Sequence, residues 1–241
     1  MNHVDQPNKP RCDRPANSAS QVDVLAIGAH PDDAEIGCAG FLLKARARGL
    51  RTGILVLTQG EMGAFADRET RIAEAHAAAE ILQVDAFEML DLPDAGLELN
   101  RENTLRVTEV LKRLRPQMVL TPYYDDPHPD HAVVGPLYRR AAYLATRPTL
   151  FPEHAPLFPQ PRHLMFPVSF HASGRPTFVI DISDVYHIKQ EALQAHSSQY
   201  APILFAVEIA ARYYGMIILA AHGEGFISES TLPLSSDLSI L

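Results

Sequence analysis

The sequence has little cysteine, no concentration of basic residues and no long uninterrupted apolar segment. Two cysteines, Cys12 and Cys38, are too few for the disulfide framework of a small secreted protein, so we expect both to be reduced in a cytoplasmic protein. Lys and Arg total 21 against 29 Asp and Glu, a formal net charge of -8. Because nucleic-acid binding needs clustered basic side chains, this composition argues against nucleic acid as the main partner.

Segments typical of secretion or membrane insertion are also lacking. Residues 1–21 are polar and contain no apolar signal-peptide core, so we predict a disordered tail there. The most apolar late segment, 201–221, is interrupted by Glu208, Arg212 and Gly215, whereas a membrane span needs ~20 residues nearly free of charge. We therefore expect a buried amphipathic helix in this segment, and no membrane partner.

What the sequence does contain is an alternation of short apolar runs with helical patterns. The runs typical of doubly buried strands are 22–27, 52–58, 86–90 and 118–122, and the helical segments are 36–48, 69–82, 101–114 and 132–145. This order predicts an α/β fold, with a Rossmann-like, mostly parallel sheet and helices on both faces. The chain has 241 residues, of which 46% are hydrophobic, so we expect a single domain over 22–241 with one ample core.

After residue 146 the pattern changes. Residues 147–162 hold five prolines and predict a loop. Two strand-like segments follow at 163–168 and 177–182, and two helical ones at 184–198 and 203–211. They predict a small C-terminal portion that either extends the sheet or caps it.

Two polar clusters follow the first and the fourth predicted strands. Residues 30–35 read HPDDAE, and residues 128–131 read HPDH. In open α/β sheets, ligands bind beyond the carboxyl ends of the strands, and two such ends can be neighbours. His and Asp are zinc ligands, and a catalytic zinc usually keeps three protein ligands and one open position. We predict one shared metal site, with a spare Asp available as a general base.

Each cluster also has an explanation without catalysis. Asp33 could cap the following helix, and 11 histidines make some chance pairing with Pro and Asp expected. A non-catalytic sugar- or nucleotide-binding module is disfavoured because the first strand leads into carboxylates, which repel a pyrophosphate, and not into a G-x-G-x-x-G turn. A structural metal site is disfavoured by the spare acid Asp32.

The two clusters, as AHPDDAEIG at 29–37 and HPDH at 128–131, resemble the signature motifs of the PIG-L/LmbE-like zinc-dependent N-deacetylases. The resemblance covers nearly the whole chain after the tail, with a third similar block at 58–63. Later blocks at 178–183, 196–199, 212–215 and 223–226 resemble the bacterial branch that includes the N-acetylglucosaminyl-malate deacetylases of bacillithiol biosynthesis. The resemblance implies a cytoplasmic hydrolase that removes an acetyl group from a GlcNAc conjugate.

The resemblance also implies a metal site and a base. His30, Asp33 and His131 would bind Zn²⁺, and Fe²⁺ is an alternative because ligand type alone does not fix the metal. Asp32 would be the general base that activates the metal-bound water.

Further roles follow for the second cluster and the third block. His128, as an imidazolium, would stabilise the tetrahedral oxyanion, and Asp130 would orient it. Arg71 would contact the anionic part of the substrate, and Tyr200 is a candidate for an assisting tyrosine. Glu74 lies three residues after Arg71 and could pair with it on one helix.

The chain departs from the malate-specific branch at Pro127, where that branch often has a basic residue. Arg139 and Arg140 could compensate, although we expect them to be surface charges, and no role follows for Glu61. The substrate therefore stays open between GlcNAc-malate, another GlcNAc conjugate and a different N-acyl amine, such as a thiol conjugate or a chitin-derived sugar. The family relationship suggests a homo-oligomer.

Overall fold

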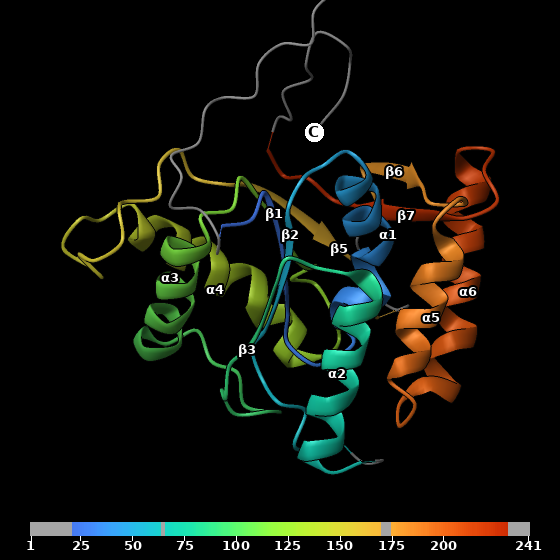
Figure 1. Ribbon diagram of the computed structural model, residues 1–241, viewed down its shortest axis with the longest axis horizontal. Coiled ribbons are helices and arrows are strands. Elements are labelled where there is room, and N and C mark those ends of the chain that lie inside the picture. Colours follow the sequence, from blue (N-terminus) through green and yellow to red (C-terminus); the bar gives the residue numbers. More distant parts are fainter. Residues whose placement is uncertain (1–20, 64–65, 170–174, 231–241) are drawn as a thin grey trace, which may run out of the picture.

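The computed structural model describes residues 21–63, 66–169 and 175–230 (Figure 1). The predicted tail and Cys12 lie outside these residues, apart from Gln21, while Cys38 is buried and free. A five-stranded sheet has the order β3-β2-β1-β4-β5, and all four strand pairings are parallel. Its strands are β1 (Val24–Gly28), β2 (Thr52–Val56), β3 (Ala86–Met89), β4 (Met118–Pro122) and β5 (Arg162–Phe166).

Helices cover both faces of this sheet, as predicted. On one face lie α3 (Arg101–Leu114) and α4 (Pro129–Ala145), and on the other α1 (Asp33–Ala47) and α2 (Arg68–Leu82) (Figure 1). Side chains of β1 alternate between the two cores: Leu25 and Ile27 pack with α3 and α4, whereas Val24 and Ala26 pack with α1. Burial on both faces explains why the sequence of β1 is continuously apolar.

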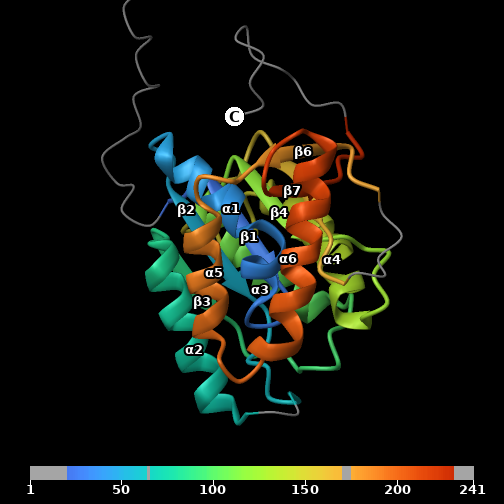
Figure 2. The same ribbon diagram turned by 90° about the vertical axis from the view of Figure 1, so that its right-hand side faces the viewer.

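The C-terminal portion both extends and caps the sheet. β5 joins the sheet edge, while β6 (Phe178–Asp181) and β7 (Gly223–Phe226) form a separate antiparallel pair. A bridge between Met165 and Ile227 connects this pair to β5. The helices α5 (Tyr186–Ala195) and α6 (Tyr200–Ile217) stand side by side in front of the α1 face (Figure 2).

The late apolar segment forms the predicted helix, α6, but only one side of this helix is buried. Phe205 is 73% exposed, Tyr213 55% and Met216 65%, so one side of the helix presents apolar side chains to solvent. The opposite side of the helix, which includes Val207 and Ala211, is buried and packs against the rest of the protein. Among the helices of the described residues, none is sufficiently long and apolar to cross a membrane.

A buried ion pair fastens the C-terminal portion to α1. Lys189 Nζ lies 2.6 Å from Glu224 Oε1, and the two side chains are 2% and 3% exposed. Lys189 also donates to the carbonyl of Ile36, and Glu224 accepts from the amides of Gly40 and Phe41, each at 2.8 Å. The ion pair thus also contacts backbone groups of α1, close to the residues that begin this helix.

Removing one partner of this pair should cost far more than removing a surface charge. In Lys189→Met, Glu224 stays buried without its cation, so we expect the free energy of unfolding to fall by about 3–5 kcal/mol. Lys44→Met is the matched control, because Lys44 pairs with Asp184 at the surface, 3.0 Å away, and such pairs contribute about 0–1 kcal/mol. Urea denaturation of the three proteins measures the effect, and equal midpoints for the two variants would contradict it.

His163 of β5 should make stability depend on pH. Its Nε2 lies 2.9 Å from Thr121 Oγ1, and burial, with a smaller contribution from Arg139, lowers its pKa from 6.5 to about 4. Between these values the unfolded chain binds a proton that the folded chain does not, so stability falls as pH falls from 6.5 to 4. Since the ring is partly exposed, we expect a loss of about 2 kcal/mol. The stability difference between wild type and His163→Gln should shrink by this amount from pH 7 to pH 4; a constant difference would contradict the prediction.

Candidate metal centre

The two polar clusters meet at the carboxyl edge of the sheet. β1 pairs with β2 on one side and β4 on the other, so the chain leaves β1 and β4 at the point where the strand order reverses. The segment after β1 carries His30 and Asp33, and the segment after β4 carries His128 and His131. All four line one open cavity of about 300 Å³. The prediction that these strand ends are neighbours is confirmed.

Three donor atoms of these residues form a compact triangle. His30 Nδ1 and His131 Nε2 are 3.2 Å apart, Asp33 Oδ1 lies 3.2 Å from His131 Nε2, and it lies 4.0 Å from His30 Nδ1. Ligands about 2.0–2.2 Å from a tetrahedral zinc lie about 3.3–3.6 Å from one another, so the triangle fits three sites of such an ion. The other oxygen of Asp33, Oδ2, accepts from the amides of Ala29 and His30 and not from α1. Asp33 therefore does not have the helix-capping role considered above.

The outward nitrogens of both rings face further carboxylates. His30 Nε2 lies 3.1 Å from Asp94 Oδ1 and 3.2 Å from Asp130 Oδ2, and His131 Nδ1 lies 3.2 Å from Asp126 Oδ1. Carboxylates in these positions fix the ring orientation and tautomer of metal-binding histidines. The arrangement leaves Nδ1 of His30 and Nε2 of His131 directed at the triangle.

This concentration of carboxylates favours a positive charge in the triangle. Burial lowers the pKa of His131, yet Asp33 and Asp126 together raise it to about 10. Burial raises the pKa of the carboxyl groups, but their contacts, including those with the His30 and His131 rings, lower it by more. The pKa of Asp33 is therefore lowered, and those of Asp94 and Asp126 fall to about 2. A buried set of anions around two imidazoles is the donor chemistry that suits a divalent cation.

His128 stands against the triangle. Its ring stacks on His131 with centroids 4.5 Å apart, and its Nδ1 accepts from the amide of Asp130 at 3.3 Å. The Asp130 carboxylate instead accepts from the amides of Ala95 and Leu97 and contacts His30. Asp130 thus orients His128 through its backbone, not through its carboxylate as we expected. Burial and the two neighbouring rings lower the pKa of His128, which favours the neutral imidazole over the predicted imidazolium.

Two other groups of donors lie within 4.8 Å of one another. His128 can join His30 and His131 in one group, and Asp94 and Asp130 can join His30 in the other. The second group faces Nε2 of His30 only, and the Asp130 oxygens already accept from backbone amides. We therefore favour the triangle that contains Asp33 over this second group.

Asp32 is a buried carboxylate held in a strained conformation beside the triangle. It caps α1 with φ 113° and makes no side-chain capping hydrogen bond. Such angles are costly for a residue other than glycine and are concentrated at functional sites. Burial and the charge of Asp33 raise the pKa of Asp32 to about 6. A poised carboxylate that lines the cavity has the properties of a general base.

Arg71 is the cationic partner of Asp32. Its Nη2 donates to the carbonyl of Pro31 at 2.7 Å and lies 3.7 Å from Asp32 Oδ2. The guanidinium packs over Gly60, whose φ is 66° and where a Cβ would come within 3.1 Å of Arg71 Nε. Arg71 also lines the cavity, but it is only 4% exposed, so positioning Asp32 is the contact that the structure gives it.

The remaining candidates are Tyr200, Glu74, Arg139 and Arg140. Tyr200 begins α6, but its side chain is outside what the structure describes. Glu74 does not pair with Arg71; its carboxylate accepts from the hydroxyls of Ser197 and Ser198. Arg139 and Arg140 lie next to each other on α4.

Arg139 and Arg140 are surface charges, as expected. Arg139 pairs with Glu229 at 3.0 Å, and Arg140 donates to the carbonyl of Leu99. Neither lines the metal cavity. Glu61 joins two loops by accepting from the amides of Gln59 and Asp94.

Sequence reasoning missed three residues around the centre. Asp94 follows β3 and Asp126 follows β4, so each stands beyond the carboxyl end of a strand, which was the available signal. His196 is 1% exposed, and its Nε2 lies 3.7 Å from Glu35 Oε2. His196 begins the block at 196–199 that carries part of the resemblance, but no role was assigned to it, because only the fold brings the end of α5 to the centre.

Known proteins that this chain resembles include deacetylases. The family model described as GlcNAc-PI de-N-acetylase (PIG-L) matches residues 25–142. The chain is 31% identical to the diacetylchitobiose deacetylase of Thermococcus kodakarensis, over 89% of this chain and 85% of that protein. It is 29% identical to a probable N-acetyl-alpha-D-glucosaminyl L-malate deacetylase 2 of Bacillus subtilis, over 77% of this chain and 86% of that protein.

The fold and one further activity also appear among the similar proteins. The crystal structure of the conserved protein TT1542 from Thermus thermophilus superposes with a TM-score of 0.84 at 35% identity, covering 91% of this chain and 99% of that one. The 4-oxalmesaconate hydratase of Pseudomonas putida is 25% identical, over 79% of both proteins.

Proposed function

Because the chain belongs to the PIG-L family of de-N-acetylases, we propose that it is a zinc-dependent hydrolase that removes the acetyl group from a GlcNAc conjugate. The observation that carries the proposal is the donor triangle of His30, Asp33 and His131 with the unliganded acid Asp32 beside it. Zinc bound by the three ligands supplies a Lewis acid that polarises a carbonyl and lowers the pKa of water. Fe²⁺ would fit the same donors.

Asp32 has the role of proton carrier in this proposal. It accepts a proton from the water that attacks the acetyl carbonyl, and it returns that proton to the nitrogen of the breaking amide bond. Water and the acetamide thereby become acetate and a primary amine. Arg71, 3.7 Å away, keeps the Asp32 carboxylate in place.

His128 is suited to hold the oxyanion without being charged. Because the Asp130 amide donates to Nδ1, the proton of the neutral ring lies on Nε2. That N–H can donate to the oxygen of the tetrahedral intermediate, where a single well-placed donor contributes about 10²–10³-fold to the rate.

The substrate class follows from what the similar enzymes share. One is named for diacetylchitobiose and another for N-acetylglucosaminyl malate, and both of these compounds contain an N-acetylglucosamine unit. Pro127 carries no charge, and Arg139 and Arg140 are engaged at the surface, so these positions give no support to a malate-specific site. We therefore propose a GlcNAc conjugate other than GlcNAc-malate.

Acetate release from a panel of substrates tests this proposal. Zinc-loaded protein is incubated with N,N'-diacetylchitobiose, GlcNAc-malate and methyl GlcNAc, and with 4-oxalmesaconate for the hydratase alternative. We expect acetate from at least one GlcNAc conjugate, with GlcNAc-malate not preferred. Preference for GlcNAc-malate would overturn the substrate assignment only. Hydration of 4-oxalmesaconate without acetate release from any GlcNAc compound would overturn the proposed reaction.

A further inference from the structure

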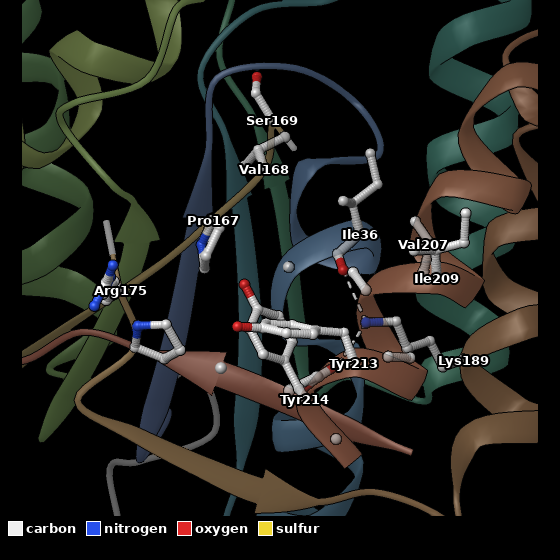
Figure 3. Close-up of a pocket in the computed structure, with 17 residues that line it drawn as sticks. Ile36, Pro167, Val168, Ser169, Arg175, Lys189, Val207, Ile209, Tyr213 and Tyr214 are labelled. Carbon is white, nitrogen blue, oxygen red and sulfur yellow. Dashed lines mark hydrogen bonds and ion pairs between the residues drawn. The ribbon is translucent and has the colours of Figure 1, made fainter. Parts of the chain in front are cut away.

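A second cavity adjoins the metal centre and is not explained by the chemistry above (Figure 3). It has a volume of about 290 Å³ and lies between α1, α6, β7 and the segment after β5. Ile36 and Val168 line both this cavity and the metal cavity. The two spaces are therefore neighbours that share these two lining side chains.

The walls of this cavity are mainly aromatic and aliphatic. Tyr213 and Tyr214 extend from α6 into it with ring centroids 5.5 Å apart, and Pro167 and Val168 lie opposite them (Figure 3). Val207 adds to the α6 side. Such surfaces favour apolar ligand groups with a few polar contacts.

The charged side chains of the cavity are largely neutralised. Lys189 and Glu224 line it but pair with each other at 2.6 Å, and both are further bonded to the backbone of α1. Among the described lining residues, Arg175 is the other charged side chain, and it stands at the far side from Ile36 (Figure 3). The part of the cavity nearest the metal centre thus presents no unpaired charge among those residues, which disfavours an anionic group there.

The cavity opens onto the exposed apolar side of α6. Ile209 and Tyr213 line the cavity and are nevertheless 48% and 55% exposed. Phe205 and Met216 continue this surface along the helix, at 73% and 65% exposure. A contiguous apolar surface beside a cavity is typical of a ligand-binding site.

We propose that this cavity binds an apolar aglycone, an alkyl or aryl group attached to the amino sugar, while the acetamido group lies at the metal centre. The inference rests on the proposed deacetylation and names its substrate more closely. Sharing Ile36 and Val168 with the metal cavity favours a part of the substrate as the occupant over a second protein chain, which would cover the outside of α6 without needing the cavity.

Alkyl β-glycosides of GlcNAc with methyl, butyl and hexyl groups test the aglycone site. A fully buried methylene contributes about a fourfold gain in binding, and the cavity is partly open, so we expect kcat/KM to rise at least tenfold from methyl to hexyl. Ala210→Phe fills the cavity from α6, and Tyr213→Ala removes one wall; each should bring the hexyl-to-methyl ratio close to one. Tyr143→Ala is the matched control, since Tyr143 is 56% exposed on α4, and the ratio should not change.

Calorimetric binding of hexyl β-glucoside, which has no acetyl group, separates this inference from the proposed reaction. Binding to wild type that is weakened at least fivefold by Ala210→Phe would support the aglycone site even if no GlcNAc compound were hydrolysed. Absence of a chain-length effect together with absence of binding would overturn it. A chain-length effect that persists in Ala210→Phe but is lost in Phe205→Ser would also overturn it. The alkyl group would then bind on the solvent-exposed side of α6 and not in the cavity.

Discussion

Replacing Asp32 by Asn should lower kcat for acetate release by about 10³-fold, within the ~10²–10⁴-fold range of general acid–base catalysis. The Asn side chain has nearly the same shape but cannot accept the proton of the attacking water. Because Asp32 lies outside the donor triangle, the variant should keep one metal ion per chain. Its KM should change little, since the deleted interaction involves the moving proton and not substrate binding.

The control for this variant is Asp91→Asn, which removes a surface carboxylate that pairs with Arg106 at 2.7 Å. Metal content by mass spectrometry and unfolding midpoints accompany the kinetics of both proteins. A decrease of less than tenfold in Asp32→Asn would assign the base to another residue. Loss of the metal in Asp32→Asn would make this residue a ligand and contradict its place beside the triangle.

The central fold could be predicted because every core element satisfies a local rule. Strands such as 118–122 are mostly apolar because both faces are covered, and α3 begins and ends where its pattern does. β7 was not predicted, because two of its four residues are glycine and Glu224 is polar. Glu224 is bonded to Lys189 and to the backbone of α1. These groups are distant from it in sequence, and only the fold brings them together.

Residues of the metal centre that cluster in short sequence motifs could be predicted. Residues that only the fold brings to the centre could not. His30 and His131 each stand in a short motif after a strand. Asp94 and Asp126 contact those rings, but Asp94 stands in an ordinary turn, and the sequence does not distinguish Asp126 from its neighbour Asp125. The direction of the Asp130 carboxylate could not be predicted either, because it is decided by the amides of a separate loop.

Removing a ligand of the triangle should abolish both metal binding and activity. We expect His131→Ala to fall from one zinc per chain to less than about 0.1 after dialysis, with acetate release below detection, since two remaining ligands hold the ion poorly. Chelation of the wild-type protein should have the same effect on activity, and added Zn²⁺ should restore it. His131→Ala should not recover at the same Zn²⁺ concentration.

The carboxylates behind the rings provide a graded test of the same centre. Asp94→Ala and Asp126→Ala leave the triangle intact but release the rings of His30 and His131, so zinc affinity should fall by about 10–100-fold in each. His187→Ala, an exposed histidine of α5, is the control and should bind zinc as wild type does. If Asp33→Ala kept full zinc affinity while His128→Ala lost it, the ion would be bound by the three histidines, and His128 could not be the donor to the oxyanion. Zinc affinity thus decides between the two donor groups independently of any substrate.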